Sequence, residues 1–264
     1  ITVSGVADAA QGADIDAFAK DVTYNVVDDA NDIAGELSGS NDQLDEAVSV
    51  TVTGGTVDVA DAAAIQGISG YVDGTASSYD IVDSASAIVG ATDAILNTGG
   101  VATVTVSGVA TAAQGGDIDA FSKDVAFNVV DDAQDVIDEM TAHSEIASAQ
   151  SITVSGVANA AQGVTIDGFT KEVVFDVDSS ADALATAIGG DSTLLDEAGS
   201  VTVTGGTVDA ADAAAIQGIS GYVDSTASSY DIVDSASAIV GATDAILNTG
   251  GVATVTVSGV ATAA

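Results

Sequence analysis

The sequence has no cysteine and only one histidine, His143. Without cysteine the chain has neither a disulfide framework nor a thiolate metal site, and one histidine cannot form a metal-binding histidine cluster or a repeated catalytic site. Basic residues are also scarce, because three lysines and no arginine stand against 40 acidic residues, for a formal net charge of −37. A chain this acidic repels phosphates, so we expect no contact with nucleic acid or anionic lipid.

Long apolar runs are lacking as well. No run approaches the ~18 residues needed to span a membrane, so we expect no membrane insertion. Hydrophobic residues nevertheless make up 47% of the chain, which is too many for an acidic disordered tail. The sequence opens inside the strand-like segment ITVSG, without a signal peptide or a starting methionine. We therefore expect a folded, soluble and acidic protein.

Internal repetition is the dominant feature of what is present. Residues 50–113 recur as residues 201–264 with two changes in 64 positions, Val59 to Ala210 and Gly74 to Ser225. Residues 1–49 recur more loosely as 152–200, so the long period is 151 residues. Repetition of this kind is typical of repeat proteins whose units contact only their neighbours. We read the chain as one continuous array, a window from a longer one, with units 1–49, 50–103, 104–151, 152–200, 201–254 and the partial unit 255–264.

Each unit carries two strand signals. One is a β-branched segment such as VTVSG, and the other is an aromatic segment such as TYNVVDDA. Both alternate apolar and polar residues, which predicts strands with one face buried and one face in solvent. The eleven predicted strands are 23 to 29 residues apart and centre on Val3, Val26, Val52, Ile81, Val106, Val129, Val154, Val177, Val203, Ile232 and Val257.

Between the strands the apolar spacing changes to about three and a half residues, which predicts helices. Three helical faces follow from this spacing: Ala10, Ile15, Phe18 and Val22; Ala30, Ile33 and Leu37; and Ala64, Ile65 and Ile68. A fourth face, predicted to run without a break for three turns, consists of Ala85, Ile88, Val89, Thr92 and Ile95. Five polar residues stand two positions before a first helical alanine and are predicted N-caps: Asp28, Asp83, Asp131, Ser179 and Asp234.

These elements predict an α/β fold with a parallel sheet. Strands joined by helices are linked by crossovers, and crossovers between parallel strands are normally right-handed. The expected architecture is a right-handed solenoid of 23–29-residue strand–helix coils. A parallel β-helix with three strands per coil is the alternative, and the alanine-rich connections without alternation count against it.

We assign no catalytic, cofactor-binding or metal-ligating residue from the sequence. The Asp-rich junctions, such as VVDDANDI, have the oxygen ligands that Ca²⁺ prefers, but we favour helix capping for them. We therefore expect no required cofactor, with calcium and other divalent cations as the ions that such junctions could hold. His143 is predicted to lie in an exposed loop, and the lysines of the FxK motifs, Lys20, Lys123 and Lys171, are predicted to pair with nearby aspartates.

The ten aromatic residues occupy repeating positions and are predicted to form ladders in the core rather than sugar-binding platforms. They are Phe18, Tyr24, Tyr71, Tyr79, Phe121, Phe127, Phe169, Phe175, Tyr222 and Tyr230. The outward Thr and Ser rows are the pattern by which some solenoids bind ice, although rows with Asn25 or Asp80 interrupt them. Near-identical copies leave no single cleft for catalysis, so we expect no enzymatic activity.

The succession of VTVSG or VTVTG, an alanine-rich stretch, an aromatic strand and D-x-A-x-x-I resembles the tandem repeats of very large secreted bacterial surface proteins. Adhesins, S-layer proteins and matrix proteins, including those of marine cyanobacteria, contain such repeats. The resemblance covers the whole chain and implies an extracellular structural or adhesive role, with calcium as an optional ion.

Together these observations lead us to expect a structural repeat protein at the cell surface. It would form or extend a filament, sheath or surface layer by associating with itself. An adhesin spacer that carries a separate binding domain is the alternative, and an ice- or glycan-binding solenoid is a third hypothesis.

Overall fold

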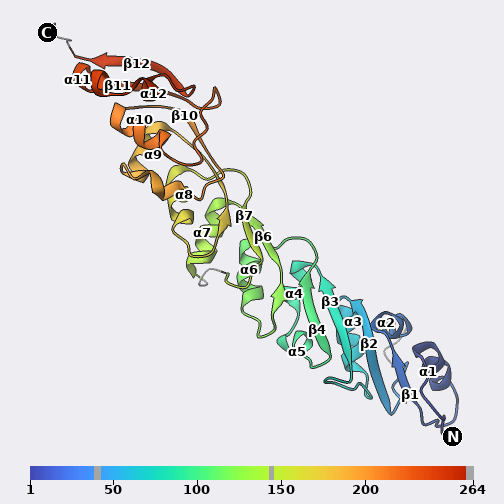
Figure 1. Cartoon of the computed structure of the whole chain (residues 1–264). Coiled ribbons are helices and arrows are strands. Elements are labelled where there is room, and N and C mark those ends of the chain that lie inside the picture. The colour runs from blue at the N-terminus through green and yellow to red at the C-terminus, as the bar shows by residue number, and fades with distance from the viewer. Residues whose placement is uncertain (39–42, 143–145, 260–264) are drawn as a thin grey trace. The chain divides into compact units, whose positions relative to one another are not determined.

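A computed structural model describes residues 1–38, 43–142 and 146–259 as an α/β structure with parallel sheets (Figure 1). Every strand pair with a described register is parallel, as predicted. The chain divides into two compact units. Unit 1 comprises Ile1–Asn128 and Ser148–Gln150, and unit 2 comprises Val129–Ala147 and Ser151–Ala264.

Unit 1 contains one five-stranded sheet in the order β1-β2-β3-β4-β5. A helix or a pair of short helices separates each strand from the next, so sequence neighbours are also sheet neighbours (Figure 1). Its elements are α1 (Ala9–Asp16), β1 (Asn25–Asp28), α2 (Ala30–Leu37), β2 (Ser49–Val57), α3 (Val59–Gly67), β3 (Ser78–Asp83), α4 (Ala85–Gly90), α5 (Asp93–Leu96), β4 (Val101–Val106), α6 (Ala112–Asp119) and β5 (Val125–Ala126).

Unit 2 contains a three-stranded sheet, β6-β7-β8, and a four-stranded sheet, β9-β10-β11-β12. Strand β6 (Asn128–Asp131) begins one residue before the unit boundary. The other elements are α7 (Ala133–Ala142), β7 (Ser151–Val154), α8 (Ala160–Asp167), β8 (Val173–Val174), β9 (Asp176–Ser179), α9 (Ala181–Ile188), the 3₁₀ helix η1 (Ser192–Leu195), β10 (Ser200–Val208), α10 (Ala210–Gln217), β11 (Ser229–Ser235), α11 (Ala236–Gly241), α12 (Asp244–Leu247) and β12 (Val252–Ser258).

Ten of the eleven predicted strand centres lie in strands, and Val3 is the exception. Residues around Val3 form isolated bridges in place of a strand, between Thr2 and Thr23 and between Ala7 and Val26. The alternation predicted from sequence is confirmed in β1 and β2. Val26 and Val52 are fully buried, whereas Asn25 is exposed.

Strand β2 changes partner halfway along its length. Ser49 to Val52 pair with β1, whereas Thr53, Thr56 and Val57 pair with β3, and the register with β3 shifts at Gly54 and Gly55. Both glycines have left-handed φ angles, +102° and +91°. A Cβ on Gly55 would lie 2.9 Å from the Ala30 nitrogen, so this turn requires glycine for space as well as for conformation.

Two of the predicted helical faces are wrong in part. The helix predicted from Ala85 to Ile95 is two helices, because α4 ends at Gly90 and Ala91 is extended at ψ 161°. Helix α1 ends at Asp16, so Phe18 lies outside it and is 61% exposed. The face predicted for α2 is confirmed, since its three apolar residues are all buried.

The prediction that aromatic residues lie in the core is confirmed for those of the TYNVVDDA-type segments. Five of them are buried to 2% exposure or less: Tyr24, Tyr79, Phe127, Phe175 and Tyr230. Phe18 is exposed, and the remaining four, Tyr71, Phe121, Phe169 and Tyr222, are of intermediate exposure. In the part of the chain that the structure describes, the helices are all too short or too polar to cross a membrane.

Candidate functional site

The aspartates at the ends of β1, β3 and β11 join strand–helix segments that follow one another along the chain, and we call each such segment a coil. Asp28, at the end of β1, accepts the Ala9 N–H with Oδ2 at 2.9 Å and the Asp29 N–H with Oδ1 at 3.0 Å. Ala9 is the first residue of α1, which belongs to the preceding coil. The carboxylate therefore satisfies a helix N–H that has no partner within its own helix.

The same arrangement recurs at two further strand ends. Asp83 accepts the Val59 N–H at 3.1 Å and the Ser84 N–H at 2.7 Å. Asp234 accepts the N–H groups of Ala210 and Ser235, at 3.1 Å and 2.6 Å. We call this arrangement the inter-coil aspartate bridge, made by Asp28, Asp83 and Asp234.

The N-cap prediction is thus wrong by one residue. The side chain that caps each helix belongs to the residue after the predicted one, because the strand continues through the first polar position. Asp29 accepts the Asp32 N–H at 3.0 Å, and Asp132 accepts the Asp135 N–H at the same distance. Three serines act in the same way, in place of the predicted Asp83, Ser179 and Asp234: Ser84, Ser180 and Ser235.

Two of these junctions bring three carboxylates together. Oxygens of Asp28, Asp29 and Asp32 lie within 4.8 Å of one another, as do those of Asp131, Asp132 and Asp135. The charge of Asp29, and then that of Asp28, raises the pKa of Asp32. Such a group attracts cations and supplies the oxygen ligands that Ca²⁺ uses, although Asp29 is already occupied as a helix cap.

Asp28 and Asp32 of the first junction line an open groove of about 590 Å³ between α1 and α2. Four of its lining residues are acidic, namely Asp8, Asp28, Asp32 and Glu36. The groove therefore has an anionic wall that is open to solvent and favours positively charged partners.

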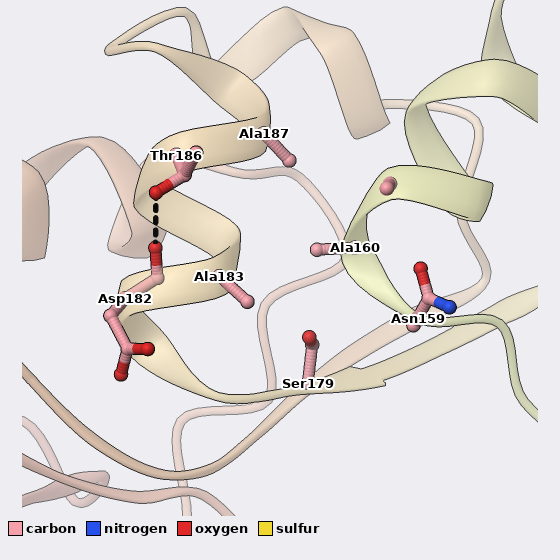
Figure 2. Close-up of a pocket in the computed structure, with 8 residues that line it drawn as sticks. Asn159, Ala160, Ser179, Asp182, Ala183, Thr186 and Ala187 are labelled. Carbon is pink, nitrogen blue, oxygen red and sulfur yellow. Dashed lines mark hydrogen bonds between the residues drawn. The ribbon is translucent and has the colours of Figure 1, made fainter.

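The equivalent groove in unit 2, 151 residues further along, is nearly neutral (Figure 2). It measures about 400 Å³ between α8 and α9, and Asp182 is its single acidic lining residue. Thr186 donates from its hydroxyl to the Asp182 carbonyl at 2.7 Å. Both residues belong to α9, so α9 itself forms this side of the groove. The acids of unit 1 are replaced there by Asn159, Ser179, Ala183 and Ala187.

The outward face of the sheets carries hydroxyl groups that are already hydrogen-bonded. Ser49 Oγ donates to Asn25 Oδ1 at 2.7 Å, and Thr103 Oγ1 donates to Asp80 Oδ1 at 2.5 Å. Unit 2 repeats this pattern, with Ser200 donating to Asp176 at 2.6 Å and Thr204 donating to Asp178 at 2.7 Å. These hydroxyls connect neighbouring strands, which leaves them less able to act as a free array for ice or sugars.

Two of the three lysines contact main-chain carbonyls. Lys123 Nζ lies 2.7 Å from the Val101 oxygen, and Lys171 Nζ lies 3.4 Å from the Ala147 oxygen. For Lys123 this contact replaces the predicted pairing with an aspartate. His143 lies outside the described residues.

Comparison with known proteins gave no match, since no family model, no curated protein and no solved structure matches the chain. The candidate site therefore depends on geometry alone. Sequence reasoning missed the inter-coil aspartate bridge and the two grooves. An alignment of residues 1–49 with 152–200 contains part of the signal for the grooves, because Asp8, Asp28, Asp32 and Glu36 are among the acidic positions that become neutral in the second copy.

Proposed function

We propose that this chain is a structural, extracellular repeat protein whose strand–helix coils stack as a right-handed solenoid. It forms or extends a filament, sheath or surface layer at the cell surface. The observation that carries the proposal is the inter-coil aspartate bridge, which recurs at Asp28, Asp83 and Asp234. Each aspartate accepts the N–H of the first residue of the preceding helix and the N–H of the residue that follows the aspartate. A contact that repeats in this way belongs to the coil and not to one unique site.

The burial of individual coils supports stacking. In unit 1, Val104 and Val106 of β4 are 1% and 6% exposed, and β4 pairs with β5 through Val104 and Val125. In unit 2 the identical residues of β12, Val255 and Val257, are 39% and 43% exposed. The same sequence is thus buried where a further strand pairs with it, which agrees with repeat units that bury their apolar residues against their neighbours.

The charge of the chain suits such a role outside the cell. Forty acidic residues on coils that repeat at short intervals repel one another, and salt screens this repulsion. Divalent cations fit the proposal as counter-ions that gather at the Asp28–Asp32 junction and allow acidic faces to approach. No ion is required by the fold itself, because the strand-end aspartates already have N–H partners.

Negative-stain electron microscopy of the native full-length protein, before and after EDTA, tests the proposal. Long uniform filaments or a lattice are the expected result. Single thin rods with a globular tip would instead identify an adhesin spacer. Measurements of thermal hysteresis and binding to a glycan array test the third hypothesis, and we expect neither to give a signal, because the outward hydroxyls of Ser49 and Thr103 are engaged.

A further inference from the structure

The two near-identical copies provide a comparison within one molecule. Residues 50–113 and 201–264 differ at two positions, and one of these follows an exposed aspartate. Asp73 precedes Gly74 in the first copy, whereas Asp224 precedes Ser225 in the second. The sequence on either side is the same in both copies, so exchanging residues 74 and 225 tests what this one residue contributes at each aspartate.

The two aspartates hold different hydrogen bonds. Asp73 Oδ1 accepts the N–H of its own successor, Gly74, at 2.7 Å and the Gly100 N–H at 3.1 Å. Asp224 Oδ1 accepts the Gly250 N–H at 2.6 Å, and Gly250 is the counterpart of Gly99, one residue before the counterpart of Gly100. The N–H of Ser225, however, points to the Val223 carbonyl at 3.0 Å.

Backbone conformation also differs at the two positions. Gly74 has a φ of +94°, which glycine adopts without strain. Ser225 is not among the described residues with a positive φ. The two turns therefore differ in backbone conformation as well as in hydrogen bonding, since the Gly74 N–H donates to the Asp73 carboxyl group and the Ser225 N–H donates to the Val223 carbonyl.

We propose that Asp73 is a site of spontaneous isomerisation to isoaspartate and that Asp224 resists the same change. The Gly74 backbone nitrogen attacks Cγ of the protonated Asp73 carboxyl group. The C–N bond forms, and the carboxyl hydroxyl leaves with the amide proton as water. The product is a five-membered succinimide, and one water molecule then opens it at either carbonyl. Opening at the main-chain carbonyl gives isoaspartate, with the chain running through the former side chain.

The reaction depends on holding the two groups together. The hydrogen bond to Oδ1 keeps the Gly74 nitrogen beside the Asp73 carboxyl group, so less motion is needed to bring it to Cγ, and glycine has no Cβ to obstruct the nitrogen. Both conditions hold at Asp73 and Gly74, whereas Ser225 meets neither. The inference concerns the chemistry of this turn and does not depend on the proposed function.

Isomerisation would loosen the contact between neighbouring coils. Asp73 joins its loop to Gly100, which directly precedes β4. Isoaspartate lengthens the main chain by one methylene and moves the carboxylate away from the Gly100 N–H. The packing there is close, since a Cβ on Gly99 would lie 2.8 Å from the Gly74 Cα. A modified turn therefore cannot keep the same contact.

A second Asp–Gly pair, Asp167–Gly168, serves as an internal control. Gly168 caps α8 in a right-handed conformation, with φ −79° and ψ −5°, and its N–H donates to the Ile166 carbonyl. Asp167 Oδ1 accepts the Glu197 N–H at 3.1 Å instead. The sequence at this pair favours isomerisation, but its geometry does not, so we expect Asp167 to change more slowly than Asp73.

The test is to incubate the folded 264-residue protein and to measure isoaspartate at each site by peptide mass spectrometry with electron-transfer fragmentation. We expect isoaspartate at Asp73 to form at least about tenfold faster than at Asp224, because only Asp73 has the nitrogen in place. Gly74→Ser should reduce the rate at Asp73, and Ser225→Gly should raise the rate at Asp224. Each variant carries the residue of the other copy, and circular dichroism checks that both remain folded. Equal rates at Asp73 and Asp224 in the folded protein, or no response to either variant, would overturn the proposal.

Discussion

Ser77 Oγ accepts the buried N–H of Val52 at 3.1 Å and donates to the Val72 carbonyl at 2.6 Å. Ser77 is 2% exposed, and it is one of two buried polar residues in the described chain, with Ser228 as the other. Ser228 makes the same bonds to Val203 and Val223, at 3.2 Å and 2.8 Å. The serine hydroxyl thus takes the place of the carbonyl group that a neighbouring strand would offer to this N–H of β2.

Replacing this serine should be costly. Ser77→Ala removes the acceptor of a buried N–H, so we expect the free energy of unfolding to fall by about 1–3 kcal/mol. Urea denaturation followed by circular dichroism measures the change. Ser78→Ala is the matched control, because Ser78 is exposed, and its effect should be small. A loss for Ser78→Ala as large as that for Ser77→Ala would contradict this account.

The inter-coil aspartate bridge gives a second prediction. Asp83→Ala leaves both the Val59 and Ser84 N–H groups without their acceptor, whereas Asp83→Asn keeps one acceptor oxygen. Hydrogen bonds to a charged group contribute about 1.5–3 kcal/mol each, so the alanine variant should lose more stability than the asparagine variant. The comparison is made by urea denaturation at neutral pH. Equal stability of the two variants would show that the bridge adds nothing beyond the charge.

Much of the fold could be predicted from the sequence, because the burial of the strand residues depends on contacts that recur from one coil to the next. Val26, Val52 and Ile81 alternate with polar residues, and all three are fully buried in strands. The parallel pairing followed from the length of the connections. These features are local or repeat regularly along the chain, so a single sequence is enough to predict them.

What could not be predicted depends on particular neighbours. The segments around Val3 and Val106 have nearly the same sequence, yet only Val106 lies in a strand, with partners on both sides of β4. Phe18 and Phe121 also share their local sequence, and Phe18 alone is exposed. The inter-coil aspartate bridge was missed for a similar reason, because Asp28 and Asp29 are both good caps and only the position of α1 distinguishes them.

Acidic pH should stabilise the Asp-rich junctions. Asp29 and then Asp28 raise the pKa of Asp32, and Asp132 and then Asp131 raise the pKa of Asp135. A carboxyl group with a raised pKa in the folded state binds protons more readily than in the unfolded state. Its ionised form therefore lowers the free energy of unfolding at neutral pH, and this loss disappears as the pH falls below the folded-state pKa.

Asp32→Asn tests this directly. The variant should melt at a higher temperature than the wild type at neutral pH and low salt, and the difference should shrink in mildly acidic buffer or at high salt. Differential scanning calorimetry gives the melting temperatures. Asp14→Asn, which changes an exposed aspartate of α1, controls for the loss of one charge. An equal gain for both variants would assign the effect to net charge and not to the junction.

Cations should act on the same junction. Adding NaCl to the protein in low-salt buffer should raise the melting temperature, because the net charge of −37 is screened. Calcium chloride at the same ionic strength distinguishes screening from binding. A further rise with Ca²⁺ that EDTA reverses and that Asp32→Asn reduces would make the cluster of Asp28, Asp29 and Asp32 a calcium site. An unchanged melting temperature in both salts would contradict the role of repulsion.

Two glycines in neighbouring helices should respond in opposite ways to the same substitution. A Cβ on Gly12 of α1 would lie 2.7 Å from Leu44 Cδ2 and 2.8 Å from Val26 Cγ2, both in the core. A Cβ on Gly35 of α2 would meet nothing within 4 Å. Gly35→Ala should stabilise the protein by about 0.5–1 kcal/mol, because alanine favours a helix more than glycine does. Gly12→Ala receives the same helical gain but forces core side chains apart, at a cost of about 1–3 kcal/mol, so its net effect should be destabilising. Urea denaturation of both variants measures the two changes in the free energy of unfolding. Stabilisation by Gly12→Ala would show that Leu44 and Val26 do not pack against α1 as described.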